Sequence, residues 1–159
     1  MTAHEFSLVG LRGGVISLSE FRGGPILVTN TASLCGFTPQ YAGLQDLWTE
    51  YGGRGLTVLA VPSPDFGGQE HDDPVAVAAV CDARFRITFP VAAPTHVIGR
   101  EATPLFRWIG DRAGFVGRPR WNFYKYVIGR DGELVQWFSS VTKPGAGAIR
   151  SVIERALLP

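Results

Sequence analysis

The chain has 159 residues, the length of one ordinary domain and enough to bury a hydrophobic core. Its 15 basic and 14 acidic residues give a formal net charge of +1, so charge does not indicate a nucleic acid partner or an anionic membrane. No targeting segment is evident, and no stretch has the roughly 20 apolar residues that a membrane-spanning helix needs. We therefore expect a single domain over residues 1–159, cytoplasmic and without integral membrane association.

The first predicted element is a buried strand over residues 25–30, "PILVTN", which is short and apolar. A helix follows, with Thr38 as its N-terminal cap and the pair Gly52 and Gly53 at its end. Residues 56–62, "LTVLAVP", repeat the buried-strand pattern. Together they predict a β-α-β unit with parallel strands and a right-handed crossover.

A second helix is predicted in "DDPVAVAAVCDARF", where Asp73 is the cap and Cys81 lies near the end. The segment "TFPVA" (88–92) has the composition of a short strand. "TPLFRWIG" (103–110) predicts a short helix.

The last part of the chain predicts a hairpin and a helix. Apolar positions alternate over residues 123–139, on both sides of a turn at Asp131 and Gly132. Residues 147–158, "GAIRSVIERALL", follow as the terminal helix. A β-α-β half followed by a hairpin and a helix is typical of a thioredoxin-like α/β fold, a central mixed β-sheet flanked by helices.

Cys35 follows the first strand and precedes the first helix. Helix N-termini stabilise negative charge, and this lowers the pKa of a thiol placed there. Free cysteines are also among the most buried residues, so Cys35 is equally consistent with a packing role on position alone.

Cys81 is the only other thiol, 46 residues from Cys35 (81 − 35). Thr38 occupies the position where a Cys-x-x-Cys oxidoreductase has its second cysteine, which argues against a simple dithiol exchanger. A sulfenic acid on Cys35 would need another thiol to resolve it, and Cys81 is the candidate. The alternative is that Cys81 belongs to an apolar helix face with Val77 and Val80.

Three further residues carry donor groups. "FGGQE" (66–70) follows the second strand, so Gln69 is expected at the same sheet edge as Cys35. "RWNFYKY" (120–126) supplies Trp121 and Asn122, an indole and an amide. Taken singly, the first segment is consistent with an ordinary glycine turn and the second with core packing.

The histidines His4, His71 and His96 are scattered without ligand spacing, so we expect no metal site. We also expect no bound cofactor.

The segments "NTASLCGFTPQYAGLQDL", "VPSPDFGGQE" and "WNFYKY" resemble the three signature regions of the glutathione peroxidase family, in the same order and at matching distances. The similarity extends over essentially the whole chain. It implies a thioredoxin-fold enzyme that reduces hydrogen peroxide and organic hydroperoxides. By this resemblance, Cys35 is the peroxidatic cysteine. Gln69 and Trp121 are donors to it, Asn122 completes the tetrad, and Cys81 resembles the resolving cysteine of members that use thioredoxin.

The chain also departs from the family. "VPSPDF" (61–66) stands where the family commonly has Phe-Pro-Cys-Asn-Gln-Phe, which leaves Cys81 as the sole resolving candidate. The "EHDDP" loop replaces the usual Glu-Pro-Gly. A long insertion between Phe89 and Trp121, which resembles a tetramerisation loop in some animal members, is missing, so we expect a monomer or a small homo-oligomer.

We therefore expect a peroxidase in which Cys81 resolves Cys35 and thioredoxin regenerates the enzyme. Three alternatives stay open: a glutathione-dependent one-cysteine peroxidase, a peroxide sensor that passes oxidation to a partner protein, and a non-catalytic binding domain. Unwinding of the helix around residues 74–85 would be needed for Cys81 to reach Cys35. Arg118, Arg120 and Lys125 would either attract glutathione carboxylates or an acidic partner, or be solvated surface charges.

Overall fold

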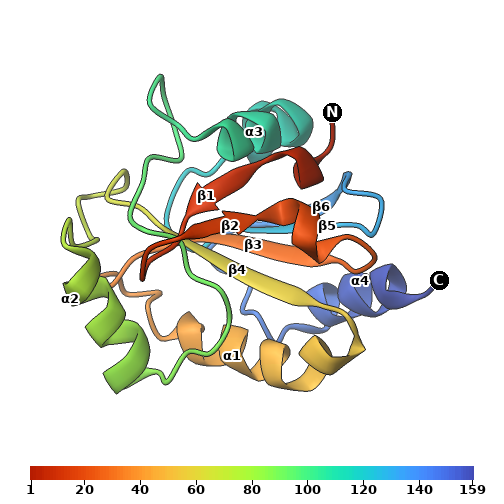
Figure 1. Cartoon of the computed structure of the whole chain (residues 1–159), viewed down its shortest axis with the longest axis horizontal. Coiled ribbons are helices and arrows are strands. Elements are labelled where there is room, and N and C mark those ends of the chain that lie inside the picture. Colours follow the sequence, from red (N-terminus) through yellow and green to blue (C-terminus); the bar gives the residue numbers. More distant parts are fainter.

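A four-stranded sheet forms the centre of the computed structural model, which describes residues 1–159 (Figure 1). The sheet has the order β4-β3-β5-β6. Its strands are β3 (Ile26–Thr31), β4 (Thr57–Pro62), β5 (Lys125–Ile128) and β6 (Leu134–Phe138). β3 pairs with β4 in parallel and with β5 in antiparallel, and β6 is antiparallel to β5. The predicted mixed sheet is confirmed, with β3 in its interior.

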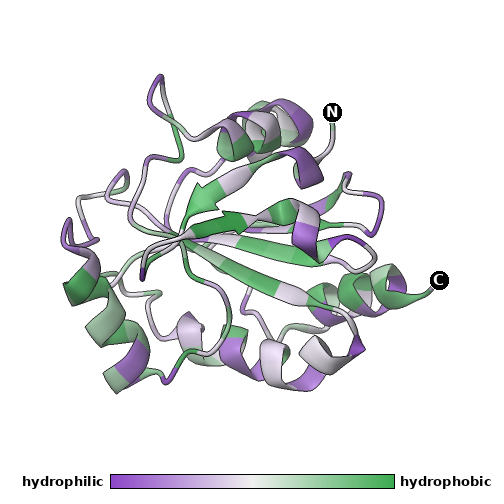
Figure 2. Cartoon of the chain, in the orientation of Figure 1, coloured by the Kyte–Doolittle hydropathy of each residue, from purple (hydrophilic) through white to green (hydrophobic).

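Helices cover both faces of the sheet because side chains along each strand alternate between two hydrophobic clusters. On β3, Leu27 belongs to one cluster and Val28 to the other. The Leu27 face is covered by α1 (Gln40–Tyr51) and α4 (Gly147–Leu157), and the opposite face by α3 (Pro104–Gly117). Figure 2 shows the strands as mainly hydrophobic and the outer sides of the helices as more hydrophilic.

The predicted β-α-β unit is confirmed, because α1 connects the parallel strands β3 and β4. α1 ends at Tyr51, directly before the predicted glycine pair. One 3-10 turn, η3 (Gly52–Arg54), then leads to Gly55, whose φ of 114° lies in the left-handed region that glycine tolerates. The left-handed glycine that ends this helical segment is therefore Gly55, three residues after the predicted Gly52.

The predicted N-terminal cap of α1 is wrong. α1 begins at Gln40, and Thr38 lies before it in consecutive tight turns. Instead of capping the helix, Thr38 Oγ1 accepts a hydrogen bond from the Cys35 backbone N–H at 3.0 Å and donates to the Ala32 carbonyl at 2.8 Å. The hydroxyl thus braces the turn that carries Cys35.

The predicted second helix is confirmed as α2 (Pro74–Ala79). Asp73 caps it, since its carboxylate accepts from the Val75 backbone N–H at 2.9 Å. The helix continues as one π-helical segment, η4 (Val80–Arg84), which contains Cys81.

The third helix starts as predicted but is longer. Thr103 caps α3 by accepting from the Phe106 N–H at 3.4 Å. The helix then runs to Gly117 rather than to residue 110. It passes Gly114, whose φ of 77° and ψ of −178° interrupt it.

The predicted strand "TFPVA" (88–92) is not formed. Val91 and Ala92 make only isolated bridges, with Ala60 and Gly10 respectively. The proline in this segment has no backbone N–H to donate, which prevents a regular ladder.

The predicted terminal hairpin and helix are confirmed as β5–β6 and α4. Gly132, with a φ of 83°, lies in the hairpin turn.

A second hairpin near the N-terminus was not predicted. It pairs β1 (Ser7–Val9) with β2 (Val15–Ser17) in antiparallel. Its strands have three residues each, too few for a clear period in the sequence. Gly13 and Gly14, both with positive φ, form the tip.

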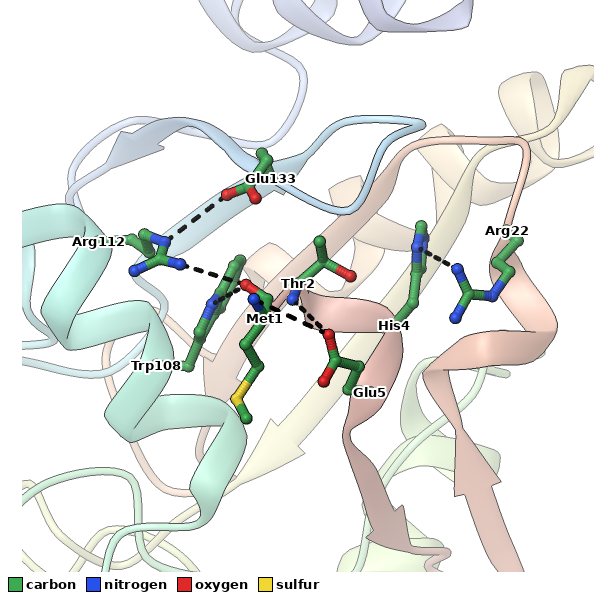
Figure 3. Close-up of polar contacts among 8 residues, drawn as sticks. All are labelled: Met1, Thr2, His4, Glu5, Arg22, Trp108, Arg112 and Glu133. Carbon is green, nitrogen blue, oxygen red and sulfur yellow. Dashed lines mark hydrogen bonds and ion pairs between the residues drawn. The ribbon is translucent and has the colours of Figure 1, made fainter.

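The first residues of the chain are fastened to α3 and to the β5–β6 turn (Figure 3). The Trp108 indole and the Arg112 guanidinium each donate to the Met1 carbonyl at 3.2 Å. Arg112 also pairs with Glu133 at 3.6 Å. These contacts hold the N-terminal segment against the face of the sheet that α3 covers.

Among the helices, none combines the length and the apolar character required to cross a membrane. The cytoplasmic location, the single-domain organisation and the monomeric or small oligomeric state stay predictions.

Replacing Gly24 by Ala should destabilise the protein. A Cβ at Gly24 would lie 2.0 Å from the carbonyl oxygen of Gly55, where the chain enters β3 beside the entry to β4. We expect a loss of about 1–3 kcal/mol or more in the free energy of unfolding, measured by urea denaturation. Gly53→Ala is the matched control, because nothing lies within 4 Å of its Cβ position. Equal stability of the two variants would contradict this account.

Candidate functional site

Three chain segments converge at the carboxyl ends of β3 and β4. Because these strands are parallel, the loops that follow them leave the same end of the sheet, which is the end where α2 lies (Figure 1). The third segment precedes β5 and carries Trp121. Asn30 in β3 fixes it, since its Nδ2 donates to the Trp121 carbonyl at 2.8 Å.

Cys35 is almost fully buried, with 8% of its surface exposed. Its Sγ accepts a hydrogen bond from the Phe37 backbone N–H at 3.3 Å. A donated hydrogen bond of this kind stabilises negative charge on sulfur. Together with the Thr38 brace, it holds the thiol in one fixed turn.

Gln69 and Asn122 are joined directly, since Asn122 Nδ2 donates to Gln69 Oε1 at 3.0 Å. The Gln69 backbone carbonyl accepts from the Leu34 N–H at 2.9 Å, which fastens Gln69 to the residue before Cys35. With Oε1 engaged by Asn122, the amide nitrogen of Gln69 is the group left to donate to a ligand.

Trp121 lies against the glycine turn that precedes Gln69. Its ring and that of Phe66 have centroids 6.0 Å apart. Gly67 has a φ of 68°, and a Cβ there would lie 3.0 Å from the indole ring of Trp121. Glycine is therefore required both by the backbone and by the approach of the indole. The Trp121 indole N–H has no hydrogen-bond partner within the protein.

The structure brings Cys35, Gln69, Trp121 and Asn122 to one end of the sheet, as the sequence predicts. None of the three donor side chains makes a hydrogen bond to Cys35 Sγ, whose one donor is the Phe37 backbone.

Cys81 is in a different environment from Cys35. It is 1% exposed and belongs to the hydrophobic cluster that contains Tyr41 and Val77, whereas Cys35 belongs to neither cluster. Burial is the main cause that raises the pKa of the Cys81 thiol to about 11, against a smaller opposing effect of the Tyr41 hydroxyl. Both cysteines are free thiols. The two thiols thus lie in different surroundings and are not joined by a disulfide.

The segment that carries Cys81 is held from outside by the N-terminal hairpin. Arg12, at the hairpin tip, pairs with Asp82. A cavity of about 280 Å³ lies between hairpin and helix and has Cys81, Leu11 and Ile87 among its lining residues.

Lys125 is not in either of the two places that the sequence left open for it. Lys125 is fully buried, so it neither attracts a ligand carboxylate nor is a solvated charge, unlike the exposed Arg118 and Arg120. Its Nζ donates to the Ser139 and Ser140 carbonyls at 3.2 Å, and burial lowers its pKa to about 7.

Ser140 and Asp65 were not identified from the sequence. The Ser140 hydroxyl donates to the Asn122 carbonyl at 2.6 Å, so the chain after β6 supports the site. Asp65 accepts from the Val97 N–H at 2.7 Å and pairs with His96 at 2.6 Å. The only signal for Asp65 was the unusual "VPSPDF" segment.

The family model for glutathione peroxidase matches residues 3–110. A hydroperoxy fatty acid reductase from Synechocystis sp. is 39% identical over 98% of this chain and 96% of that protein. A glutathione peroxidase-like peroxiredoxin from Chlamydomonas reinhardtii is 36% identical over 95% and 93%.

Solved structures agree with this similarity. The crystal structure of Trgpx in apo form superposes with a TM-score of 0.79 at 31% identity, over 99% of this chain and 95% of that chain. A thioredoxin family protein from Chlorobium tepidum gives a TM-score of 0.70 at 19% identity, over 96% and 93%, and shows the shared fold. The predicted thioredoxin-like fold is confirmed.

Replacing Thr38 by Val should loosen the Cys35 turn. The variant leaves the Cys35 N–H and the Ala32 carbonyl without their hydroxyl partner in a buried site. We expect a loss of about 1–3 kcal/mol in the free energy of unfolding, measured by urea denaturation of the reduced protein. Thr38→Ser keeps the hydroxyl and should lose much less. If the Val and Ser variants are equally stable, the hydroxyl does not brace the turn.

The Cys81 thiol should react slowly in the folded protein. Its raised pKa lowers the thiolate fraction at pH 8 by about a hundredfold relative to an unperturbed thiol. We expect alkylation by iodoacetamide, followed by mass spectrometry, to be slower by about that factor or more in buffer than in urea. The experiment uses the Cys35→Ser variant, in which Cys81 is the only thiol that can be alkylated. Equal rates in buffer and urea would show that Cys81 is accessible in the native state.

Proposed function

Because this chain belongs to the glutathione peroxidase family and is a thiol peroxidase that reduces hydroperoxides, we propose that Cys35 is its peroxidatic cysteine. The observation that carries the proposal is the fixed turn at the carboxyl end of β3, in which the Phe37 N–H donates to Cys35 Sγ. Cysteine attacks peroxide as the thiolate, and this donor fixes the position of Cys35 Sγ for that attack.

In the proposed reaction, the Cys35 thiolate attacks the distal oxygen of the hydroperoxide. The S–O bond forms as the O–O bond breaks, the alkoxide or hydroxide leaves and takes up a proton, and the thiol becomes a sulfenic acid. Negative charge moves from sulfur to the leaving oxygen during this step. Donors placed beforehand around that oxygen lower the barrier, typically by a few kcal/mol each.

The amide nitrogen of Gln69 and the indole nitrogen of Trp121 are the proposed donors. Two observations support this role: the Asn122 bond occupies Gln69 Oε1, and Trp121 Nε1 has no partner within the protein. Asn122 is then a positioning residue, which fixes the orientation of the Gln69 amide.

Cys81 is the proposed resolving cysteine, and thioredoxin the proposed reductant. The Cys81 thiolate would attack the sulfenic sulfur of Cys35, so that the S–S bond forms as the S–O bond breaks and the hydroxide that leaves takes up a proton to give water. Thioredoxin would then reduce that disulfide by thiol exchange. The Cα atoms of a disulfide must come within about 7 Å, so the buried Cys81 has to leave the core. The short α2 and the π-helical η4 are consistent with local opening.

A glutathione-dependent one-cysteine mechanism is the second candidate, and the burial of Cys81 favours it. A thiol with a pKa of about 11 in a packed cluster is a poor nucleophile until its segment opens. In this mechanism glutathione attacks the sulfenic acid of Cys35 directly, and Cys81 is a core residue.

The two mechanisms are distinguished by peroxide consumption coupled to NADPH oxidation. We expect the wild type to turn over hydrogen peroxide with thioredoxin and thioredoxin reductase, and both Cys35→Ser and Cys81→Ser to fall to the background rate. The physical reason is that one variant lacks the attacking thiol and the other cannot form the disulfide that thioredoxin reduces.

The same proteins are assayed with glutathione and glutathione reductase. Glutathione-driven turnover that survives in Cys81→Ser would assign the one-cysteine mechanism. Turnover that survives in Cys35→Ser would refute the proposed role of Cys35. Stoichiometric oxidation with neither reductant supporting turnover, but with transfer to another protein, would indicate a peroxide sensor.

A further inference from the structure

Asp65 is a nearly buried carboxylate that the proposed reaction does not use. It lies in the Gln69 loop, residues 63–70, which follows β4 and carries one of the two proposed donors. Its side chain is 11% exposed. Aspartate stands here where the family commonly has glutamine, so the resemblance supplies no role for it.

Both oxygens of the Asp65 carboxylate accept hydrogen bonds. Oδ1 accepts from His96 Nδ1 at 2.6 Å, and Nδ1 carries the proton because a carboxylate only accepts. Oδ2 accepts from the backbone N–H groups of Val97 at 2.7 Å and Ile98 at 3.1 Å. Burial by itself raises the pKa of Asp65, but the three hydrogen bonds outweigh it and lower this pKa below its usual value. The group is therefore ionised at neutral pH.

The segment that Asp65 contacts is itself fixed at two points. The Thr95 N–H donates to the carbonyl of Pro62, the last residue of β4, at 2.9 Å. The His96 carbonyl accepts from the N–H of Thr103, the cap of α3, at 3.0 Å. Asp65 thus ties a loop to a segment that is bound to both β4 and α3.

The residues that follow Asp65 contact one proposed donor and carry the other. The ring centroid of Phe66 lies 6.0 Å from that of Trp121. A Cβ at Gly67 would lie 3.0 Å from the same indole ring, so the turn and the indole are in close contact. Gln69 is only four residues after Asp65. The carboxylate therefore fixes the start of the segment that sets the positions of the indole and the amide.

We propose that Asp65 is a positioning residue for peroxide reduction. By fastening the Gln69 loop to residues 95–98, it holds the Gln69 amide and the Trp121 indole around the leaving oxygen. The inference rests on the proposed function, because these donors have a role only if Cys35 reduces peroxide. Misplaced donors stabilise the developing charge less, and the rate falls steeply with their displacement.

The test compares two reactions of one thiol, in the Cys81→Ser variant, where Cys35 is the only cysteine. Hydroxide leaves from hydrogen peroxide and needs donors as its charge develops, whereas iodide leaves from iodoacetamide and needs no proton. We expect Asp65→Ala to slow the loss of the Cys35 thiol to peroxide about tenfold and to keep alkylation within about twofold. Quenched samples are counted by mass spectrometry. A general change in the Cys35 turn or in its pKa would slow both reactions.

Two variants at the same contact keep the test informative even where Asp65→Ala does not fold. Asp65→Asn retains an oxygen that accepts from the Val97 and Ile98 N–H groups, so it should keep most of the peroxide rate. His96→Ala removes one of the three hydrogen bonds, at a side chain that is 46% exposed. It should show a smaller slowing, again with peroxide only.

Asp131→Ala is the matched control. It removes a carboxylate that accepts a loop N–H, that of Glu133 at 3.0 Å, in the β5–β6 turn. This turn lies at the end of the sheet opposite the site, since Ile128 pairs with Ile26 at the start of β3. The control should react with both reagents at the parent rates.

A double-mutant cycle tests whether Asp65 acts through the donors. Gln69→Ala/Trp121→Phe removes the amide and the indole N–H but keeps an aromatic ring at position 121. In that background, Asp65→Ala should change the peroxide rate by less than about twofold, because there are no donors left to position.

The outcomes separate the two proposals. A peroxide rate that Asp65→Ala and His96→Ala leave unchanged overturns the role of Asp65, and so does a slowing of both reactions alike. A slowing that persists without the donors, or that Asp131→Ala reproduces, overturns it too. All of these leave the proposed function intact. If Cys35 of the parent reacts with peroxide no faster than free cysteine, the proposed function itself is refuted.

Discussion

The position of β3 between a parallel and an antiparallel neighbour is the constraint on which the rest of this structure depends. Its parallel partner β4 sends the Cys35 loop and the Gln69 loop out of the same end of the sheet. Its antiparallel partner β5 brings the Trp121–Asn122 pair back to that end. The Asn30 side chain and its carbonyl, which accepts from Phe123 at 2.6 Å, fasten the returning segment. Residues far apart in the sequence thus reach one site through strand pairing together with the Asn30 side chain.

The two cysteines lie in different environments, and these environments predict different reactivities for the two thiols. Cys35 lies outside both hydrophobic clusters and has a backbone donor on its sulfur. Cys81 lies within a cluster that also holds Tyr41, and burial disfavours its thiolate. A thiol kept protonated in the core is protected from peroxide until its segment opens. In the proposed two-cysteine mechanism, the burial that slows the attack of Cys81 on Cys35 therefore also protects Cys81 from oxidation.

Much of the fold was predictable because local chemistry and tertiary structure agree. Asp73 caps its helix, and Gly132 turns its hairpin, as their residue types indicate. The prediction for Thr38 was wrong because a threonine hydroxyl can accept a hydrogen bond either from a helix N-terminus or from a nearby loop. Here the tertiary fold places the Cys35 N–H, rather than an N–H of α1, next to the hydroxyl. The prediction for Lys125 was wrong because a charged side chain usually lies at the surface. In this fold its ammonium group is buried and donates hydrogen bonds to the carbonyls of Ser139 and Ser140. The grouping of Cys35, Gln69, Trp121 and Asn122 was predictable only through the family resemblance, because each of these segments taken singly is consistent with packing or an ordinary turn.

The close backbone approach of Gly24 to Gly55 bears on how this chain tolerates changes in length. It joins the entries of β3 and β4 at the end of the sheet opposite the site, so the connection through α1 has a fixed span. An insertion or deletion within α1 would pull this contact apart or rotate the buried face of the helix. At the site end, the Cys35 and Gln69 loops are joined by a backbone hydrogen bond, from the Leu34 N–H to the Gln69 carbonyl, so their lengths are coupled as well. Length variation is therefore best tolerated in loops that take part in neither contact, such as the tip of the β5–β6 hairpin.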